Sequence, residues 1–239
     1  MYRIFKLTLK SALKDPFLLF WSIIVPLGGT IGLGIFIKKS NYDIRITVGM
    51  IATSIIFYAF LTTAYAILAQ RRRGVYNLLK ITPLTLTKYI ISCSAAWMTI
   101  SIICGFIVFI PSYIIFKFDF PLIGCFLMIF AMMLASLGYI FYGFIISSLC
   151  KNENQLSMIS NILLLPLLFC SDAFYSLEKM PELFRKICAI NPFQIFITAL
   201  RSSLDLQYLT FSICILSLLF YAAIGVFFAT KTFKYGEAR

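Results

Sequence analysis

Charged residues in this chain are confined to clusters, and the long stretches between the clusters contain none. The uncharged stretches of spanning length are Pro16–Ile37, Ile46–Gln70, Tyr89–Phe116, Phe120–Cys150, Asn154–Ser171 and Leu206–Thr230. A helix needs about 20 residues to cross a hydrocarbon core about 30 Å thick. A charge at the centre of a membrane costs about 2.5–3.5 kcal/mol on insertion scales. The pattern therefore predicts an all-α integral membrane protein with six transmembrane helices.

The overall composition agrees with this interpretation. Of the 239 residues, 61% are hydrophobic and 13% are charged, whereas a soluble domain has about a quarter charged residues. A very apolar soluble helical protein would not leave separate uncharged windows of spanning length. We expect one transmembrane domain, 1–239, with spans at 16–37, 46–69, 89–116, 122–149, 154–170 and 208–230.

Residues 1–15 place basic and apolar side chains on opposite faces of one helix. The basic face holds Arg3, Lys6, Lys10 and Lys14. The opposite face holds Tyr2, Phe5, Leu9, Ala12 and Leu13. This pattern is typical of an amphipathic helix lying in the membrane interface. We expect such a helix ahead of the first span, with Pro16 at the turn into the membrane.

The distribution of basic residues predicts the orientation of the spans. With six spans, both termini, the segment 71–88 and the loop at Lys151 lie on one side, and together they hold 13 of the 21 Lys and Arg residues. Because cytoplasmic loops carry the excess of Lys and Arg, both termini are expected in the cytoplasm. The net charge of +12 is explained in this way and needs no nucleic-acid partner.

The segment between the fifth and sixth spans, 178–203, is expected to form two short helices. Its uncharged run Ile187–Leu200 is too short to cross a membrane, and Asn191-Pro192 interrupts it. Two helices of about ten residues are each roughly 15 Å long. They would form an outer helical hairpin, either re-entering the bilayer or resting on its surface, and the sequence leaves both arrangements open.

Several chemistries are excluded by the residues that are missing. Histidine is absent, the seven cysteines show no CxxC spacing, and no Gly-Lys pair exists to form a phosphate-binding loop. No acidic residue lies within any predicted span, which argues against an ion-coupled transporter. We therefore assign no catalytic residue, no metal site and no cofactor to this chain.

Polar side chains inside the predicted spans are candidates for lining a substrate path. The main candidates are Thr62, Tyr65, Tyr142 and Asn161. A lone hydroxyl in a membrane helix usually bonds to its own backbone. Asn161 differs, because a carboxamide in mid-span needs a partner on another helix.

Two motifs carry a family resemblance. The first runs from Gln70 to Thr85 and reads QRRRGVYNLLKITPLT; the second comprises Asp172-Ala173-Phe174-Tyr175, Met180-Pro181-Glu182-Leu183, Asn191-Pro192-Phe193 and Ala199-Leu200-Arg201. In this order, and with the span count and the amphipathic first helix, the chain resembles the type-2 ABC transporter permeases. The resemblance covers essentially the whole chain.

The resemblance implies that 71–85 is a cytoplasmic coupling helix docking on a separate ABC ATPase. The residues carried over are Arg71, Arg72, Arg73, Gly74, Tyr76, Asn77, Leu78, Leu79, Thr82 and Pro83. It also implies a second permease subunit, identical or different, and ATP and Mg bound only by the ATPase. The family commonly has Glu where the three arginines stand here. We therefore expect these arginines to have a mixed role, anchoring the chain to anionic membrane lipids and contacting the ATPase.

The expected function is ATP-driven export of a lipophilic or amphipathic compound across a bacterial cytoplasmic membrane. Drugs, antimicrobial peptides and lipid-linked molecules are the substrate classes that the resemblance implies. The alternative is a non-transporting membrane scaffold or sensor, whose basic cytoplasmic face recruits a partner.

Overall fold

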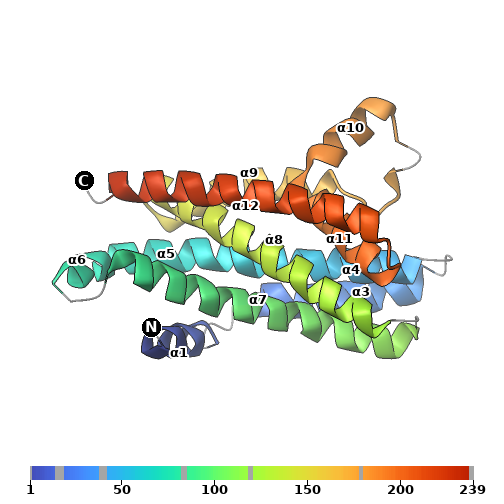
Figure 1. Ribbon diagram of the computed structural model, residues 1–239, viewed down its shortest axis with the longest axis horizontal. Helices are drawn as coiled ribbons and strands as arrows, with labels where there is room; N and C mark the ends of the chain where they lie inside the picture. Colours follow the sequence, from blue (N-terminus) through green and yellow to red (C-terminus); the bar gives the residue numbers. More distant parts are fainter. Residues whose placement is uncertain are drawn as a thin grey trace.

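The computed structural model describes residues 2–13, 19–37, 42–81, 85–117, 121–177 and 180–236. Every long regular element within these ranges is a helix (Figure 1). A helix satisfies its backbone hydrogen bonds internally, which a segment surrounded by hydrocarbon requires. The helices run side by side along the long axis of the molecule, so their ends form two opposite faces (Figure 1).

Four described helices are long and apolar enough to cross a membrane. They are Tyr42–Arg72, Thr87–Phe116, Leu122–Leu149 and Tyr208–Thr232. The first comprises α4 (Tyr42–Ile56), η2 (Phe57–Thr62) and α5 (Thr63–Arg72), and the others belong to α7 (Leu86–Phe116), α8 (Leu122–Leu149) and α12 (Tyr208–Gly236). They contain the stretches expected as spans two, three, four and six. The chain is thus an all-α, multi-pass membrane protein.

The helices at the expected first and fifth spans are shorter. Phe20–Phe36, made of η1 (Phe20–Ile24) and α3 (Val25–Phe36), has 17 residues, and so does α9 (Glu153–Phe169). A helix of that length extends about 25 Å, just under the thickness of the hydrocarbon core. Residues 14–18, with the predicted turn at Pro16, lie outside the described ranges. The count of six spans therefore stays a prediction.

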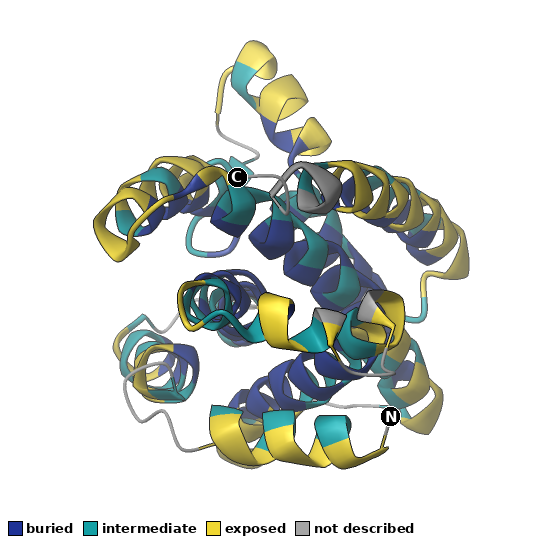
Figure 2. Ribbon diagram, turned by 90° about the vertical axis from the view of Figure 1, so that its left-hand side faces the viewer, coloured by how far each residue is buried: buried dark blue, intermediate teal, exposed yellow. Residues whose placement is uncertain are grey.

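The helix Tyr42–Arg72 forms the centre of the bundle. Of its most apolar window, 78% is buried within the protein, compared with 33% for the corresponding window of α12. Figure 2 shows the buried helices gathered in the middle and the exposed faces turned outward. Two π-helical segments, η1 and η2, contact one another here. The Ser54 hydroxyl donates a hydrogen bond to the backbone carbonyl of Ser22 within η1.

The helices between α9 and α12 meet at a corner, as a broken span or a re-entrant pair would, so the expected re-entrant or surface hairpin stays a prediction. α10 (Glu182–Ile190) and α11 (Pro192–Leu204) are bent by 84° at Asn191. The Asn191 side chain caps α11 by accepting from the Phe193 N–H at 2.9 Å. Its amide also donates to the carbonyls of Leu167 and Cys170, at the end of α9. These bonds satisfy backbone groups that both helix ends leave free.

The two helices of this corner have different surroundings. α11 enters the core, where it buries Phe193, Phe196, Ile197, Ala199 and Leu200. α10 stands away from the bundle (Figure 1) and buries only Cys188 among its residues. Only the second half of the segment 178–203 is therefore inserted among the other helices, and residues 178 and 179 lie outside the described part.

Helix α1 (Tyr2–Ala12) lies across the axes of the long helices, as the two ribbon views together show (Figures 1 and 2). It packs on α7, and the Thr8 hydroxyl lies 3.5 Å from the Cys93 thiol. α1, the short helix α6 (Val75–Lys80) and the C-terminal end of α12 all belong to the half of the molecule opposite α10. The position of α1 in a membrane interface stays a prediction.

Candidate functional site

A cavity of about 730 Å³ opens at the end of the bundle that carries α6. Four elements enclose it: α1, the stretch η2–α5, α7 and α9. Its lining residues are Leu7, Thr8, Ser11, Ala12, Thr62, Tyr65, Ala66, Ala69, Gln70, Arg73, Trp97, Glu153, Asn154 and Ser157. Apolar and polar groups both line it, so the cavity is amphipathic.

One face of the central helix forms the long wall of this cavity. Lining residues recur from Thr62 through Tyr65, Ala69 and Gln70 to Arg73, at the three- and four-residue spacing that marks one helix face. Eleven residues separate the first from the last, which corresponds to about 16 Å along a helix. The wall therefore runs from an arginine near the end of the bundle to a buried threonine roughly half a membrane core away.

Thr62 offers an unused polar atom at the inner end of the wall. Its side chain is 3% exposed, and its hydroxyl oxygen is buried without a hydrogen-bond partner in the described part of the chain. Buried polar atoms are nearly always hydrogen-bonded, so this unpaired hydroxyl next to the cavity is unusual. Thr62 also ends the π-helix η2, and π-helical turns are frequent at functional sites.

The three consecutive arginines have three different environments. Arg71 turns to α8, where its guanidinium donates to the Ser148 carbonyl at 3.0 Å and to the Cys150 carbonyl. These carbonyls lie at the C-terminal end of α8, where a cation is favoured by the helix dipole. Arg71 thus ties the end of the central helix to the end of α8.

Arg72 pairs with Glu153 in the first turn of α9, at an N···O distance of 3.1 Å. Both side chains are more than half exposed, so the pair is worth little energetically, but it gives the Glu153 carboxylate a partner at the cavity wall. Arg73 lines the cavity, and no salt bridge to it occurs among the residues that the structure describes.

Helix α6 is attached to the bundle through Tyr76. Gly74 precedes the helix with φ of 70°, a left-handed conformation that glycine adopts without a steric penalty. The buried Tyr76 donates its hydroxyl to Gln70 Oε1 at 3.3 Å and packs edge-on against Tyr89. Burial raises the pKa of Tyr76, so the phenol remains a neutral donor.

The opposite face of α6 is exposed and apolar. Leu78 is 60% exposed and Ile81, just after the helix, is 82% exposed, while Asn77 beside them is also exposed and Leu79 is partly buried. We call Asn77, Leu78 and Ile81 the end face. An apolar helix face of this kind is suited to docking in a groove of another protein. Thr82 and Pro83, which belong to the predicted coupling segment, lie outside the described residues.

A comparison with known protein families identifies the family of this chain. The family model for ABC-2 type transporters matches residues 1–204 of the 239-residue chain. The chain belongs to the ABC-2 type transporter family. The match extends from α1 through α11 and includes the cavity and α6. A search of curated proteins finds no match.

The structure of the permease separates the four candidate path residues. Thr62 and Tyr65 lie together on the cavity wall. Tyr142 instead lies between helices, where its hydroxyl donates to the Tyr221 carbonyl of α12 at 3.2 Å. Asn161 is exposed on α9 and is not among the residues that line the cavity. Its partner on another helix of this chain, which we expected, is not among the described contacts.

Other lining residues were not singled out from the sequence. Gln70, Ala66 and Ala69 share the face of Thr62 and Tyr65, so helical spacing applied to those two would have indicated them. Trp97, Thr8 and Ser11 come from α7 and α1, and no local pattern connects these helices to α5. Within the part of the permease that the structure describes, no group of His, Cys, Asp and Glu is placed to hold a metal ion.

Proposed function

We propose that this permease is the membrane-spanning subunit of an ATP-driven exporter for an amphipathic compound. The observation that carries the proposal is the amphipathic cavity beside α6, with a wall that changes from Arg73 to Tyr65 and Thr62. A compound with a polar and an apolar part would find partners for both. Drugs, antimicrobial peptides and lipid-linked molecules remain the substrate classes, and a bacterial cytoplasmic membrane with both termini inside is the proposed location.

ATP would be bound and hydrolysed by a separate chain. ABC-2 permeases normally pair with ATPase subunits, and this sequence has no phosphate-binding loop of its own. The end face of α6 is the proposed contact, because Leu78 and Ile81 expose apolar surface beyond the end of α5. Arg72 and Arg73 would then border the contact, whereas Arg71 is already engaged by α8.

A second permease would complete the assembly, as an identical or a different subunit. α9 is the proposed contact surface for it, because Met158, Ile162, Leu165 and Phe169 are all more than 40% exposed there. Asn161 lies on the same helix and is exposed as well. A carboxamide on such a surface favours a protein partner over lipid, since lipid tails offer it no hydrogen bond.

The docking test compares two single variants, each of which replaces a leucine at a different end of the molecule. In Leu78→Asp, the end face loses a leucine whose burial in an interface is worth about 1.5–3 kcal/mol, or roughly a tenfold to 150-fold loss of affinity. The matched control is Leu183→Asp on α10, where the leucine is 74% exposed. Co-purification of the cognate ATPase is measured in both, together with ATP turnover of the reconstituted complex.

We expect Leu78→Asp to lose the ATPase and Leu183→Asp to retain it. Retention of the ATPase by both variants would show that the end face does not dock it. A complex that retains the ATPase but turns over ATP without moving any amphipathic compound would instead favour the scaffold or sensor function.

A further inference from the structure

The charge balance at the cavity favours a ligand with an anionic group. Two charged side chains line it, Arg73 and Glu153. Glu153 is paired with Arg72 at 3.1 Å, whereas Arg73 has no carboxylate partner in the described ranges. The wall of the cavity thus carries one uncompensated positive charge. A guanidinium binds phosphate and carboxylate groups through several parallel N–H donors.

Gln70 adds a donor beside this arginine. Its Oε1 accepts the hydrogen bond from Tyr76 at 3.3 Å, which leaves the amide NH₂ of the same side chain available to donate. Gln70 and Arg73 are three residues apart on one helix, so their side chains lie on the same face. Asn154 and Ser157 of α9 complete the polar part of the lining.

The remaining lining is apolar, apart from a few hydroxyl groups. Leu7 and Ala12 of α1 and Ala66 and Ala69 of α5 form its sides. Trp97 of α7 is 2% exposed and also lines the cavity. The cavity therefore combines a cationic, hydrogen-bonding region with an apolar region that extends along the central helix.

We propose that this cavity binds an amphiphile with an anionic headgroup, holding the headgroup at Arg73 and Gln70 and the apolar chain against Trp97 and Tyr65. The inference rests on the proposed export function and narrows its substrate to anionic amphiphiles. The same chemistry is offered by a two-chain phospholipid of the bilayer and by a single-chain compound entering from water, so the test includes both sources.

The test measures how strongly brominated lipids quench the fluorescence of each of the two tryptophans in the chain. Trp97 lines the cavity, whereas Trp21 in η1 is 41% exposed on the outside of the bundle. The variant Trp21→Phe leaves Trp97 as the only fluorescent tryptophan, and Trp97→Phe leaves Trp21. Each full-length chain is reconstituted in phosphatidylcholine vesicles. Phosphatidylglycerol or phosphatidylcholine with brominated chains is then added at equal mole fractions, because bromine quenches tryptophan only at short range.

We expect brominated phosphatidylglycerol to quench Trp97 at a lower mole fraction than brominated phosphatidylcholine does. Trp21 should be quenched equally by both, because it reports ordinary lipid contact. Adding Arg73→Gln should weaken the preference at Trp97 by about fivefold, the contribution of one arginine near an anionic headgroup. Arg73→Lys should keep it, since the positive charge remains.

Arg185→Gln is the matched control, because it removes an exposed arginine from α10 at the other end. It should leave the preference intact. A second arm adds a single-chain brominated acyl phosphate from water. Preferential quenching of Trp97 by either anionic amphiphile supports the proposal. The amphiphile that quenches it shows whether the ligand comes from the bilayer or from water.

Equal quenching of Trp97 by anionic and zwitterionic lipids, with no effect of the acyl phosphate, would overturn the proposal. So would a preference that survives Arg73→Gln. The experiment needs no ATPase, so its failure leaves the docking test at Leu78 unaffected, and a failure of docking leaves this result standing.

Discussion

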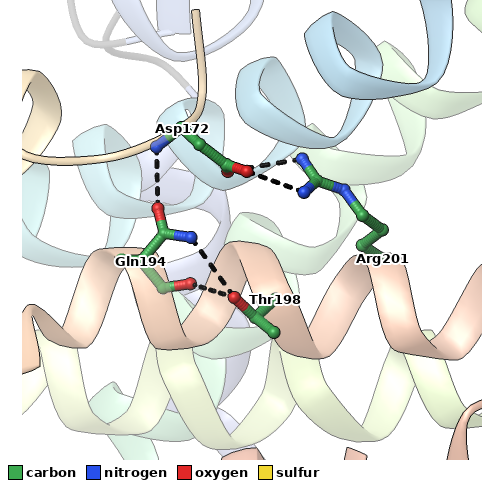
Figure 3. A network of polar contacts seen from close by, with 4 residues as sticks. All are labelled: Asp172, Gln194, Thr198 and Arg201. Atoms are coloured by element: carbon green, nitrogen blue, oxygen red, sulfur yellow. Dashed lines mark hydrogen bonds and ion pairs between the residues drawn. The ribbon is translucent and has the colours of Figure 1, made fainter. Parts of the chain in front are cut away.

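Arg201 of α11 binds the carboxylate of Asp172 with both of its terminal nitrogens, at N···O distances of 2.7 and 3.3 Å (Figure 3). Asp172 follows α9, so the pair joins two segments that flank α10 in the sequence. The Asp172 N–H also donates to Gln194 Oε1 at 2.7 Å, and Gln194 bonds in turn to Thr198. This network attaches the end of α9 to the buried helix α11.

Replacing Asp172 with alanine should destabilise the protein. The Asp172 side chain is 12% exposed and that of Arg201 is 30% exposed, so the change leaves a charge without its partner in a partly buried site. We expect the free energy of unfolding to fall by about 1–3 kcal/mol, measured by denaturant or thermal unfolding in detergent. The control is Glu182→Ala, which breaks the exposed pair with Lys186 and should cost at most about 0.5 kcal/mol. Similar losses in both variants would contradict the structural role of the Asp172–Arg201 pair.

Arg71 and Arg73 should respond differently to the same substitution. Arg71→Gln removes charged hydrogen bonds to the carbonyls of Ser148 and Cys150, and we expect a loss of about 1.5–3 kcal/mol in unfolding free energy. Arg73→Gln removes no ion pair seen in the described structure, so its stability should stay within about 0.5 kcal/mol of the parent. Unfolding of the two purified variants side by side is the measurement. If Arg71→Gln proves as stable as Arg73→Gln, the attachment of α5 to α8 contributes nothing.

Gly49 is a position where a methyl group has no room. A Cβ there would lie 2.5 Å from the carbonyl oxygen of Ala173 and 2.8 Å from its Cα, and these backbone atoms belong to the segment that carries Asp172. We predict that Gly49→Ala costs about 1–3 kcal/mol through overpacking, measured as a lower unfolding midpoint. At Gly28 nothing lies within 4 Å of an added Cβ, so Gly28→Ala should be neutral or slightly stabilising. A stable Gly49→Ala variant would disprove the close approach of α4 to this segment.

Cys170 and Cys188 should be the pair of cysteines that oxidises most readily. All seven cysteines are free, and Cys170 lies close enough to Cys188 for its side chain to raise the pKa of the Cys188 thiol. A mild added oxidant should join these two thiols in a disulfide by taking up two electrons and two protons, because the S–S bond requires the two sulfurs to meet directly. Mass spectrometry of peptides after blocking the remaining thiols identifies the bond. Cys188→Ser should abolish it, and a disulfide between other cysteines instead would show that α10 is positioned differently.

The membrane-spanning character of the protein and several local features could be predicted from sequence. Charges are excluded from the hydrocarbon by their solvation energy, so the uncharged stretches indicated where long helices lie. Asn191-Pro192 indicated a break, because proline cannot continue a preceding helix. Each of these signals depends only on a residue and its near neighbours, or on the solvent around the segment.

The corner at Asn191 shows where such reasoning stops. Its position was predicted, yet the burial of α11 and the exposure of α10 were not, since both helices carry apolar residues on one face. Which helix inserts depends on the space left between α8, α12 and α4, on which α11 mainly packs. That space is a property of the packed bundle.

The sequence alone determined that the chain is helical, that it crosses a membrane and that a basic segment follows the central helix. Only the tertiary structure assigned Arg71 to α8, Arg72 to Glu153 and Arg73 to the cavity. Three identical side chains in a row have the same intrinsic chemistry, and about 100° of helix rotation separates each from the next. The partners of Arg71 and Arg72 are more than 70 residues away in the chain, so the packing of distant helices, and not local sequence, decides what these arginines contact.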